Sequence, residues 1–591
     1  MERYPNLVTM FFARAAEKGD APFLWEKFAG RWRALSWSAT AEAVARLAEA
    51  LTALGLERGD RVLLLSRNRR EWCISDLGIM AAGGVTVPAY ITGTPADHAH
   101  VMADSGATMA IVQLRQPGDL DQALASSPHC RHVIMIEPST PIPPGHNSHG
   151  WSDLLSRQAG HVAACAAAAE RLSRDDLACL IYTSGTGGAP KGVMQHHGAI
   201  LHNVEGCSAI IADDFPAAPD RFLSVLPLSH AYEHSAGQFL PIGLGAEIWY
   251  AESLERLAGN IAEAKPTVMV VVPRLFEVLR DKIVRNLGDR GRVAGWIARQ
   301  ALALAAREEP RGGDRLRRLL VAHTIAPAIR QRFGGALKAM VSGGAPLTPE
   351  VGRFFELMGM SVLQGYGQTE AGPVVSCNRP TAGVAVATVG PPLPSTDLRI
   401  AEDGEILVRG ENVMHGYWQR PADSAQALVG GWLHTGDVGR LDEAGRLVIT
   451  DRKKDIIVND KGENVAPQRI EALLGLQPEI FQAMVFGDRR PHLVGLIVPD
   501  PEWSRTWAAA HGIADEAMLR KNPAYLSALQ AAVDRVGRTL SPAEKVRRIA
   551  VADGPFTIDN AQLTPSLKLR RQAVRAIYGP RLEALYGGER E

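Results

Sequence analysis

The chain has 591 residues, and its 64 basic residues equal its 64 acidic residues. Because this length exceeds what one hydrophobic core supports, we expect two or more domains. An apolar share of 46% and a charged share of 22% are typical of a soluble globular protein. The even charge balance lacks the basic excess of general nucleic-acid-binding proteins, so we expect no nucleic-acid partner.

The cysteines and the uncharged segments indicate the compartment. Six cysteines are scattered without CxxC spacing, which argues against a zinc site or a disulfide framework and predicts reduced thiols in the cytoplasm. The N-terminus shows no signal-peptide pattern. A longer uncharged window, 77–96, is broken by Gly83-Gly84 and Pro88, so it predicts helix, turn and strand rather than a transmembrane helix. Peripheral membrane contact and the oligomeric state stay open.

The first half of the chain alternates helical patterns with short apolar runs. The predicted helices are 41–54, 72–82 and 163–172. The predicted strands are 61–66, 84–88, 109–112, 132–136, 177–182, 223–227 and 267–272. Strands separated by helices predict parallel sheets covered by helices.

The second half of the chain contains three segments of different composition. Residues 288–320 are rich in Arg and Ala and predict helices; we expect the arginines between Arg290 and Arg318 to form a solvated face, with an anionic lipid surface as the alternative partner. After Pro391, strand-like segments among Gly turns predict a small β-rich subdomain. The charged segment 451–455 suits a hinge, so we expect an N-terminal domain over 1–453 and a C-terminal domain over 454–591.

One loop carries a clear chemical signal. From Thr183 to Lys191 the chain places Ser/Thr hydroxyls, glycines and a lysine directly after an apolar run. Backbone N–H groups can approach a phosphate closely where glycine removes the Cβ, and the lysine adds positive charge. The loop is not of the Walker type, because Pro190 precedes the lysine and Gly192 follows it. It predicts a polyphosphate-binding loop of another kind.

Further motifs follow this loop in a fixed order. They are Leu-Pro-Leu-Ser-His at 226–230, Val-Ser-Gly-Gly-Ala-Pro-Leu at 341–347, Gln-Gly-Tyr-Gly-Gln-Thr-Glu at 364–370, Trp-Leu-His-Thr-Gly-Asp at 432–437, Asp-Arg-Lys-Lys-Asp at 451–455 and Leu-Thr-Pro-Ser-Leu-Lys-Leu-Arg-Arg at 563–571. Together the motifs resemble the adenylate-forming superfamily: acyl-CoA synthetases, peptide-synthetase adenylation domains and luciferases. The segments 83–90, 227–233 and 272–277 most resemble the long- and medium-chain fatty acyl-CoA synthetases.

The resemblance implies a fold and a reaction. The fold is α/β: a large N-terminal domain of two layered α/β subdomains plus a small β-rich subdomain, and a small mobile α/β C-terminal domain. In the reaction, a carboxylate attacks the α-phosphate of ATP and releases pyrophosphate, and the thiol of coenzyme A then takes the acyl group from the acyl-adenylate. The implied cofactors and substrates are ATP, Mg²⁺, coenzyme A and a small carboxylic acid.

The resemblance also implies residue roles. The implied nucleotide-binding residues are Thr183, Ser184, Gly185, Thr186, Gly187, Lys191, Gly343, Gly344, Ala345, Pro346, Gln364, Gly365, Tyr366, Gly367, Thr369, Asp437, Arg452 and Lys454. Within this set, the 183–191 loop would bind pyrophosphate and Tyr366 would stack on adenine. Asp437 would accept hydrogen bonds from both ribose hydroxyls. Thr183 and Glu370 would supply hard oxygen ligands to Mg²⁺.

Three residues are implied to act at the reacting atoms. Lys568 would bridge the carboxylate and the α-phosphate, Thr369 would contact the α-phosphate, and His230 would close the acyl pocket. Lys454 would lie at the hinge between the two half-reactions. The plainer alternatives are a solvated basic face for Lys568 and an ordinary core histidine for His230.

The chain departs from the family pattern at Gly187, Val458 and Arg469, where a threonine, a lysine and a glutamate are usual. The change at Gly187 removes a hydroxyl contact to phosphate, and the change at Val458 removes a cation on the phosphate side. Two functional alternatives stay open beside an acyl-CoA ligase: an acyl-AMP ligase that loads a carrier protein, and a non-catalytic protein that binds adenylates. The adjacent His196 and His197 do not share a helix face, so they predict packing at a helix start rather than a metal site.

Overall fold

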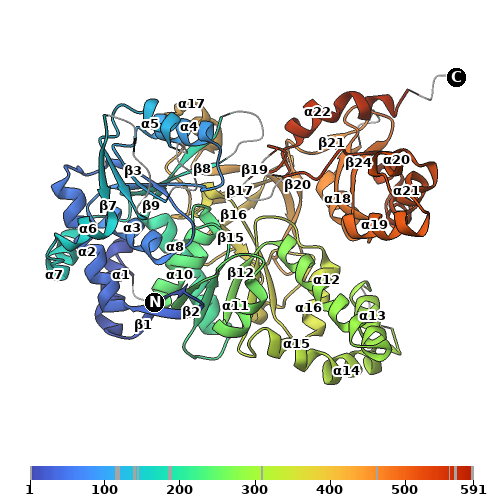
Figure 1. Cartoon of the computed structure of the whole chain (residues 1–591), viewed down its shortest axis with the longest axis horizontal. Coiled ribbons are helices and arrows are strands. Elements are labelled where there is room, and N and C mark those ends of the chain that lie inside the picture. Colours follow the sequence, from blue (N-terminus) through green and yellow to red (C-terminus); the bar gives the residue numbers. More distant parts are fainter. Residues whose placement is uncertain are drawn as a thin grey trace.

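The computed structural model describes residues 3–113, 120–137, 142, 145–183, 189–307, 311–460, 463–557, 560–564 and 569–587. Figure 1 shows a large N-terminal body and a smaller C-terminal unit, coloured orange to red, on one side of it. The predicted α/β class with a large N-terminal and a small C-terminal domain is confirmed.

The first sheet has seven strands in the order β7-β6-β5-β3-β4-β8-β9. All of its neighbours are parallel except β8 and β9. The strands are β3 (Arg61–Leu65), β4 (Val85–Ala89), β5 (Met109–Val112), β6 (His132–Met135), β7 (Asn147–Gly150), β8 (Leu177–Thr183) and β9 (Lys191–His196). They are mostly apolar and buried, as expected of parallel strands covered on both faces.

Some helices in this part of the chain begin at a side-chain cap. The Ser36 hydroxyl accepts a hydrogen bond from the Ala39 N–H at the start of α2, whose buried Val44, Leu47 and Leu51 form one face. The helices of this part of the chain are α1 (Leu7–Lys18), α2 (Trp37–Ala53), α3 (Arg70–Ala81), α4 (Pro95–Ser105), α5 (Asp121–Ala125), α6 (Trp151–Ser156), α7 (Val162–Ala169) and α8 (His197–Asp214).

The second sheet has eight strands in the order β15-β14-β13-β12-β10-β11-β1-β2. Its central strands are parallel, and an antiparallel pair lies at each edge. The strands are β1 (Pro22–Phe28), β2 (Arg31–Ser36), β10 (Arg221–Ser224), β11 (Glu247–Tyr250), β12 (Val268–Val271), β13 (Ala339–Ser342), β14 (Val362–Gly367) and β15 (Val374–Cys377). The N-terminal hairpin thus joins the second sheet, although the strands that follow it build the first.

The helices around this sheet include a long excursion between β12 and β13. They are α9 (Ala231–Glu233), the π-helix η1 (His234–Phe239), α10 (Leu240–Leu244), α11 (Leu257–Ala264), α12 (Pro273–Asp289), α13 (Arg292–Ala305), α14 (Asp314–Thr324), α15 (Ala326–Arg332) and α16 (Pro349–Leu357), with the 3-10 turns η2 (Thr369–Ala371) and η3 (Pro380–Ala382) after β14 and β15. The predicted helical character of 288–320 is confirmed over α13 and α14.

A five-stranded sheet and the C-terminal unit complete the fold. The five-stranded sheet contains β16 (Asp397–Ile400), β17 (Glu405–Arg409), β18 (Leu428–Val429), β19 (Trp432–Leu441) and β20 (Leu447–Arg452), with α17 (Pro421–Ala427) beside it. The C-terminal unit contains β21 (Ile457–Val458), β22 (Asn464–Val465), β23 (Ile480–Phe486), β24 (Leu493–Pro499) and β25 (Val546–Val551), the helices α18 (Pro467–Leu474), α19 (Pro501–Ala510), α20 (Glu516–Lys521), α21 (Pro523–Gly537) and α22 (Arg571–Ala584), and the 3-10 turn η4 (Pro542–Glu544).

All six cysteines are free thiols, as predicted. Among the described residues, no helix has the length and apolar content to cross a membrane.

Candidate nucleotide and acyl site

A single cavity of about 3070 Å³ contains the predicted site. Its wall includes every predicted site residue that the structure describes: Thr183, Lys191, His230, Gly343, Gly344, Ala345, Pro346, Gln364, Gly365, Tyr366, Gly367, Thr369, Glu370, Asp437, Arg452 and Lys454. Ser184, Gly185, Thr186, Gly187 and Lys568 lie outside the described residues. Segments more than 250 residues apart in the chain therefore meet around one space.

The ends of the predicted phosphate loop lie together. Thr183 is the last residue of β8 and Lys191 the first of β9, and the two residues pair across the antiparallel ladder. Both side chains are half-buried and line the cavity. A hydroxyl and an ammonium group therefore stand at the base of the loop.

The turn after β13 needs glycine and is held by a glutamine. A Cβ on Gly343 would lie 2.8 Å from the ring of Tyr232, and Gly344 has φ +82°. The buried Gln364 side chain accepts from the Leu347 N–H at 2.8 Å and donates to the Thr388 carbonyl at 3.1 Å. The Gln364 amide therefore fixes the turn while the residue lines the cavity.

Asp437 lies between an aromatic ring and a guanidinium group. The Tyr366 hydroxyl donates to Asp437 Oδ2 at 2.7 Å, and Arg452 Nε lies 3.2 Å from Oδ1. Asp437 and Arg452 face each other across β19 and β20, and Asp437 is only 4% exposed. Burial and the Asp437 charge raise the pKa of Tyr366 well above its ordinary value, so the phenol stays a donor and fixes the carboxylate.

Two residues that were not predicted from the sequence, Tyr417 and Asp423, contact Glu370 and Lys191. The Tyr417 hydroxyl donates to Glu370 Oε1 at 2.9 Å, and Lys191 Nζ lies 5.1 Å from the centre of the Tyr417 ring. Lys191 Nζ also lies 2.7 Å from Asp423 Oδ1. This hydrogen bond from Lys191 lowers the pKa of Asp423, and the positive charges of Arg420 and Lys454 add to the effect.

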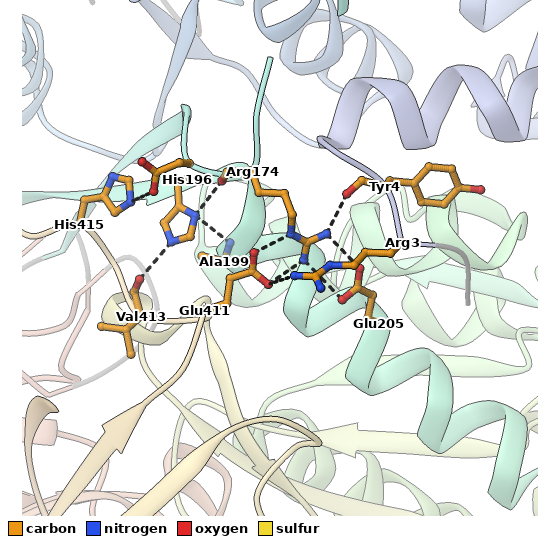
Figure 2. A network of polar contacts seen from close by, with 10 residues as sticks. Arg3, Tyr4, Arg174, His196, Ala199, Glu205, Glu411, Val413 and His415 are labelled. Atoms are coloured by element: carbon orange, nitrogen blue, oxygen red, sulfur yellow. Dashed lines mark hydrogen bonds and ion pairs between the residues drawn. The ribbon is translucent and has the colours of Figure 1, made fainter. Parts of the chain in front are cut away.

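The segment that carries Tyr417 is fixed from two sides. Its backbone pairs with β9 through Met194 N–H to the Gly416 carbonyl at 2.9 Å and Trp418 N–H to the Gly192 carbonyl at 2.7 Å. Figure 2 shows the ion-pair network at the start of the segment, where Arg174 donates to Glu411 at 2.6 and 2.9 Å and to Glu205 at 3.1 Å. Arg174 thereby ties the segment to α8.

His196, His415 and Asp175 place ligand-type atoms within 4.8 Å of one another. However, the two rings stack at 4.3 Å with an angle of 13°, and the in-plane lone pairs of parallel rings do not converge on one ion. Both nitrogens of His196 also face backbone partners, Nδ1 the Ala199 amide and Nε2 the Val413 carbonyl (Figure 2). His196 is the N-cap of α8, so the predicted packing at a helix start is confirmed.

An apolar channel leaves the polar part of the cavity. Every second residue from 268 to 272 and from 339 to 343 lines it, so it follows one face of β12 and β13 over about 13 Å. Cys207, Ile210 and Ile211 of α8 also line this apolar part of the cavity. His230 lines the same cavity, where its Nδ1 accepts from the Tyr232 N–H at 3.1 Å.

Comparisons with known proteins agree with this geometry. The AMP-binding enzyme family matches residues 11–418, and the AMP-binding enzyme C-terminal domain matches residues 454–590. The chain is 32% identical to the long-chain-fatty-acid–CoA ligase FadD15 of Mycobacterium bovis, over 99% of this chain and 98% of the relative. It is 30% identical to the peroxisomal long chain acyl-CoA synthetase 7 of Arabidopsis thaliana, over 93% and 82%.

Solved structures share the fold. The adenylation domain of a carboxylate reductase from Mycobacterium chelonae superposes with a TM-score of 0.77 at 22% identity, over 99% of this chain and 92% of that chain. The A domain of a carboxylic acid reductase from Segniliparus rugosus, in complex with AMP and a co-purified carboxylic acid, gives 0.78 at 21% identity, over 99% and 95%.

Proposed function

The chain belongs to the AMP-binding enzyme family, and from this membership we propose that it is a fatty acyl-CoA ligase. It would activate a medium- or long-chain fatty acid with ATP and transfer the acyl group to coenzyme A. The observation that carries the proposal is the cavity in which the nucleotide-site residues adjoin an apolar channel. Relatives named long-chain fatty-acid–CoA ligases over nearly the whole chain favour coenzyme A over a carrier protein as acceptor.

The polar part of the cavity suits ATP. Asp437, oriented by Tyr366 and Arg452, can accept hydrogen bonds from a ribose diol. Thr183 and Lys191 stand where the phosphates would pass the base of the loop. Lys191 is paired with Asp423 in this structure, so we propose that phosphate binding draws its ammonium group away from that carboxylate.

Mg²⁺ fits the donors present. The Thr183 hydroxyl and the Glu370 carboxylate both line the cavity, and Mg²⁺ takes one or two protein oxygens and keeps several waters. When bound, the ion would neutralise phosphate charge that otherwise repels the attacking carboxylate. The hydrogen bond from Tyr417 leaves Glu370 Oε2 as the freer oxygen for this task.

The C-terminal domain, residues 454–591, would complete the site. The described residues on both sides of Lys568, Thr564 and Leu569, line the cavity. We propose that Lys568 reaches the reacting carboxylate during adenylation, and that rotation near Lys454 removes it before coenzyme A enters. The free thiols favour the cytoplasm as the compartment. Parallel measurement of pyrophosphate release and coenzyme A consumption tests the proposed reaction.

Narrowing the channel should shorten the preferred acid. Cys207 is half-buried on the channel wall, and burial raises the pKa of its thiol to about 12. The thiol is therefore uncharged and contributes only its shape to the wall. We expect Cys207→Phe to lower kcat/KM about fourfold for each methylene it displaces, at about 0.8 kcal/mol per methylene. Short acids that end before residue 207 should react as before.

The measurement is kcat/KM for a series of acids of increasing length. Cys207→Ser nearly preserves the volume and serves as the matched control. A uniform loss at every chain length, or an unchanged profile, would rule out this path for the acyl chain.

A further inference from the structure

Two helices at one edge of the molecule expose apolar and basic side chains together. Helices α13 and α14 pack against each other and lie at the lower right of Figure 1, away from the N-terminus. On α13, Val293 is 74% exposed and Trp296 is 46% exposed. On α14, Leu316 is 76% exposed and Leu319 is 48% exposed. Soluble proteins usually keep such large side chains covered when several gather on neighbouring elements.

Arginines lie beside these apolar residues. Arg292 and Arg299 lie one turn before and after Trp296 on the outer stripe of α13, and all are exposed. On α14, Arg315 and Arg317 flank Leu316 in the chain and are exposed as well. We call these eight residues, Arg292, Val293, Trp296, Arg299, Arg315, Leu316, Arg317 and Leu319, the α13–α14 surface.

The charge of this surface is not neutralised locally. Within the described part of the chain, none of its four arginines forms a salt bridge, and the acidic residue at the start of α14, Asp314, is buried and paired with Arg307. From residue 290 to residue 332 the sequence has ten arginines against three acidic residues, although the whole chain is neutral. The positive charge is therefore concentrated where the apolar side chains are exposed.

We propose that the α13–α14 surface docks on an anionic lipid membrane. Helices that lie in a membrane interface combine Trp and Leu, which enter the acyl boundary, with Arg at the headgroups. An anionic leaflet attracts each surface arginine, whereas a neutral leaflet does not. Nucleic acid or an acidic protein would engage the arginines but offers less to four exposed apolar side chains. Docking would bring the enzyme to a phase in which long acyl chains dissolve.

The test is sedimentation of the full chain with vesicles. Wild-type protein should bind vesicles that mix phosphatidylglycerol with phosphatidylcholine, release at high salt, and bind phosphatidylcholine vesicles far less. The double variant Arg315→Gln/Arg317→Gln should bind about 25-fold more weakly, at about fivefold per arginine. Trp296→Ala/Leu316→Ala should also weaken binding, with little change in its salt dependence. Arg505→Gln/Arg547→Gln removes the same charge from exposed positions of the C-terminal unit and should bind like wild type.

Activity on a soluble acid without vesicles separates this proposal from the proposed function, because the variants should keep that activity. Equal binding to neutral and anionic vesicles, or equal loss in the control variant, would overturn the docking proposal. Binding to poly-glutamate in place of vesicles, lost in the α14 double variant, would overturn it in favour of an acidic protein partner.

Discussion

Replacing Lys568 by alanine is expected to reduce acyl-adenylate formation severely while sparing thioester formation from supplied acyl-adenylate. The charge that develops between the carboxylate and the α-phosphate needs a cation in the transition state, and donors in comparable sites contribute about 3–4 kcal/mol. We therefore expect a loss of about 10²–10³-fold in the first half-reaction. Lys568 lies outside the described residues, but Thr564 before it and Leu569 after it line the cavity.

Pyrophosphate release measures the first half-reaction, and coenzyme A thioester formed from synthetic acyl-adenylate measures the second. Arg570→Ala is the matched control, because it removes a neighbouring cation that also lines the cavity. Equal loss of both half-reactions in Lys568→Ala would contradict the role given to the lysine.

The second large effect is expected for Glu370→Gln. The substitution keeps the shape of the side chain but removes the negative charge that would hold Mg²⁺. We expect adenylation to fall at least about 100-fold and the remaining activity to need more Mg²⁺, as for loss of an electrostatic group worth about 3 kcal/mol. Tyr417→Phe removes only the hydrogen bond that orients Glu370, so its loss should be about tenfold or less.

A Mg²⁺ titration of pyrophosphate release measures both variants. Glu350→Gln is the control, since Glu350 also lines the cavity but has no proposed role. If Glu370→Gln kept the wild-type dependence on Mg²⁺, Glu370 would not be a ligand of the ion.

Several elements were predictable because their signals are local. The apolar run at 61–66 became β3, and the Ala- and Leu-rich pattern at 41–54 became most of α2. The hairpin of β1 and β2 was not predicted. Its strands carry exposed, charged positions, and β1 pairs with β11, more than 200 residues away. Periodicity shows that a segment can be a strand but not which strand will pair with it.

The same limit applies to the site. The order of the motifs predicted Glu370, Asp437 and Lys191 as site residues, because each lies in a recognisable segment, and all three line the cavity. Tyr417 and Asp423 carry no such signal. The pairing of residues 416–418 with β9, and the bond from the Met414 N–H to the Glu370 carbonyl, bring them to Glu370 and Lys191. The Gln364 amide has a further role that its motif did not indicate, since its hydrogen bonds fix the turn after β13; its nucleotide contact stays a prediction.

Two departures from the family pattern lie in the C-terminal unit. Arg469 forms an ion pair with Glu544, and Val458 is 39% exposed in β21. Neither side chain displaces Glu370 or Asp437 from the cavity wall. We therefore expect these departures to affect the affinity for ATP more than the chemistry.

The central claim is that one cavity performs both adenylation and transfer to coenzyme A. The most direct test is to measure acid-dependent pyrophosphate release and coenzyme A consumption in the same samples, across acids from short to very long chains. The claim predicts that the pyrophosphate released equals the coenzyme A consumed, and that both changes need ATP and acid. It also predicts that medium- or long-chain acids react best. No acid-dependent pyrophosphate release with any acid would contradict it and favour a protein that binds adenylates without catalysis.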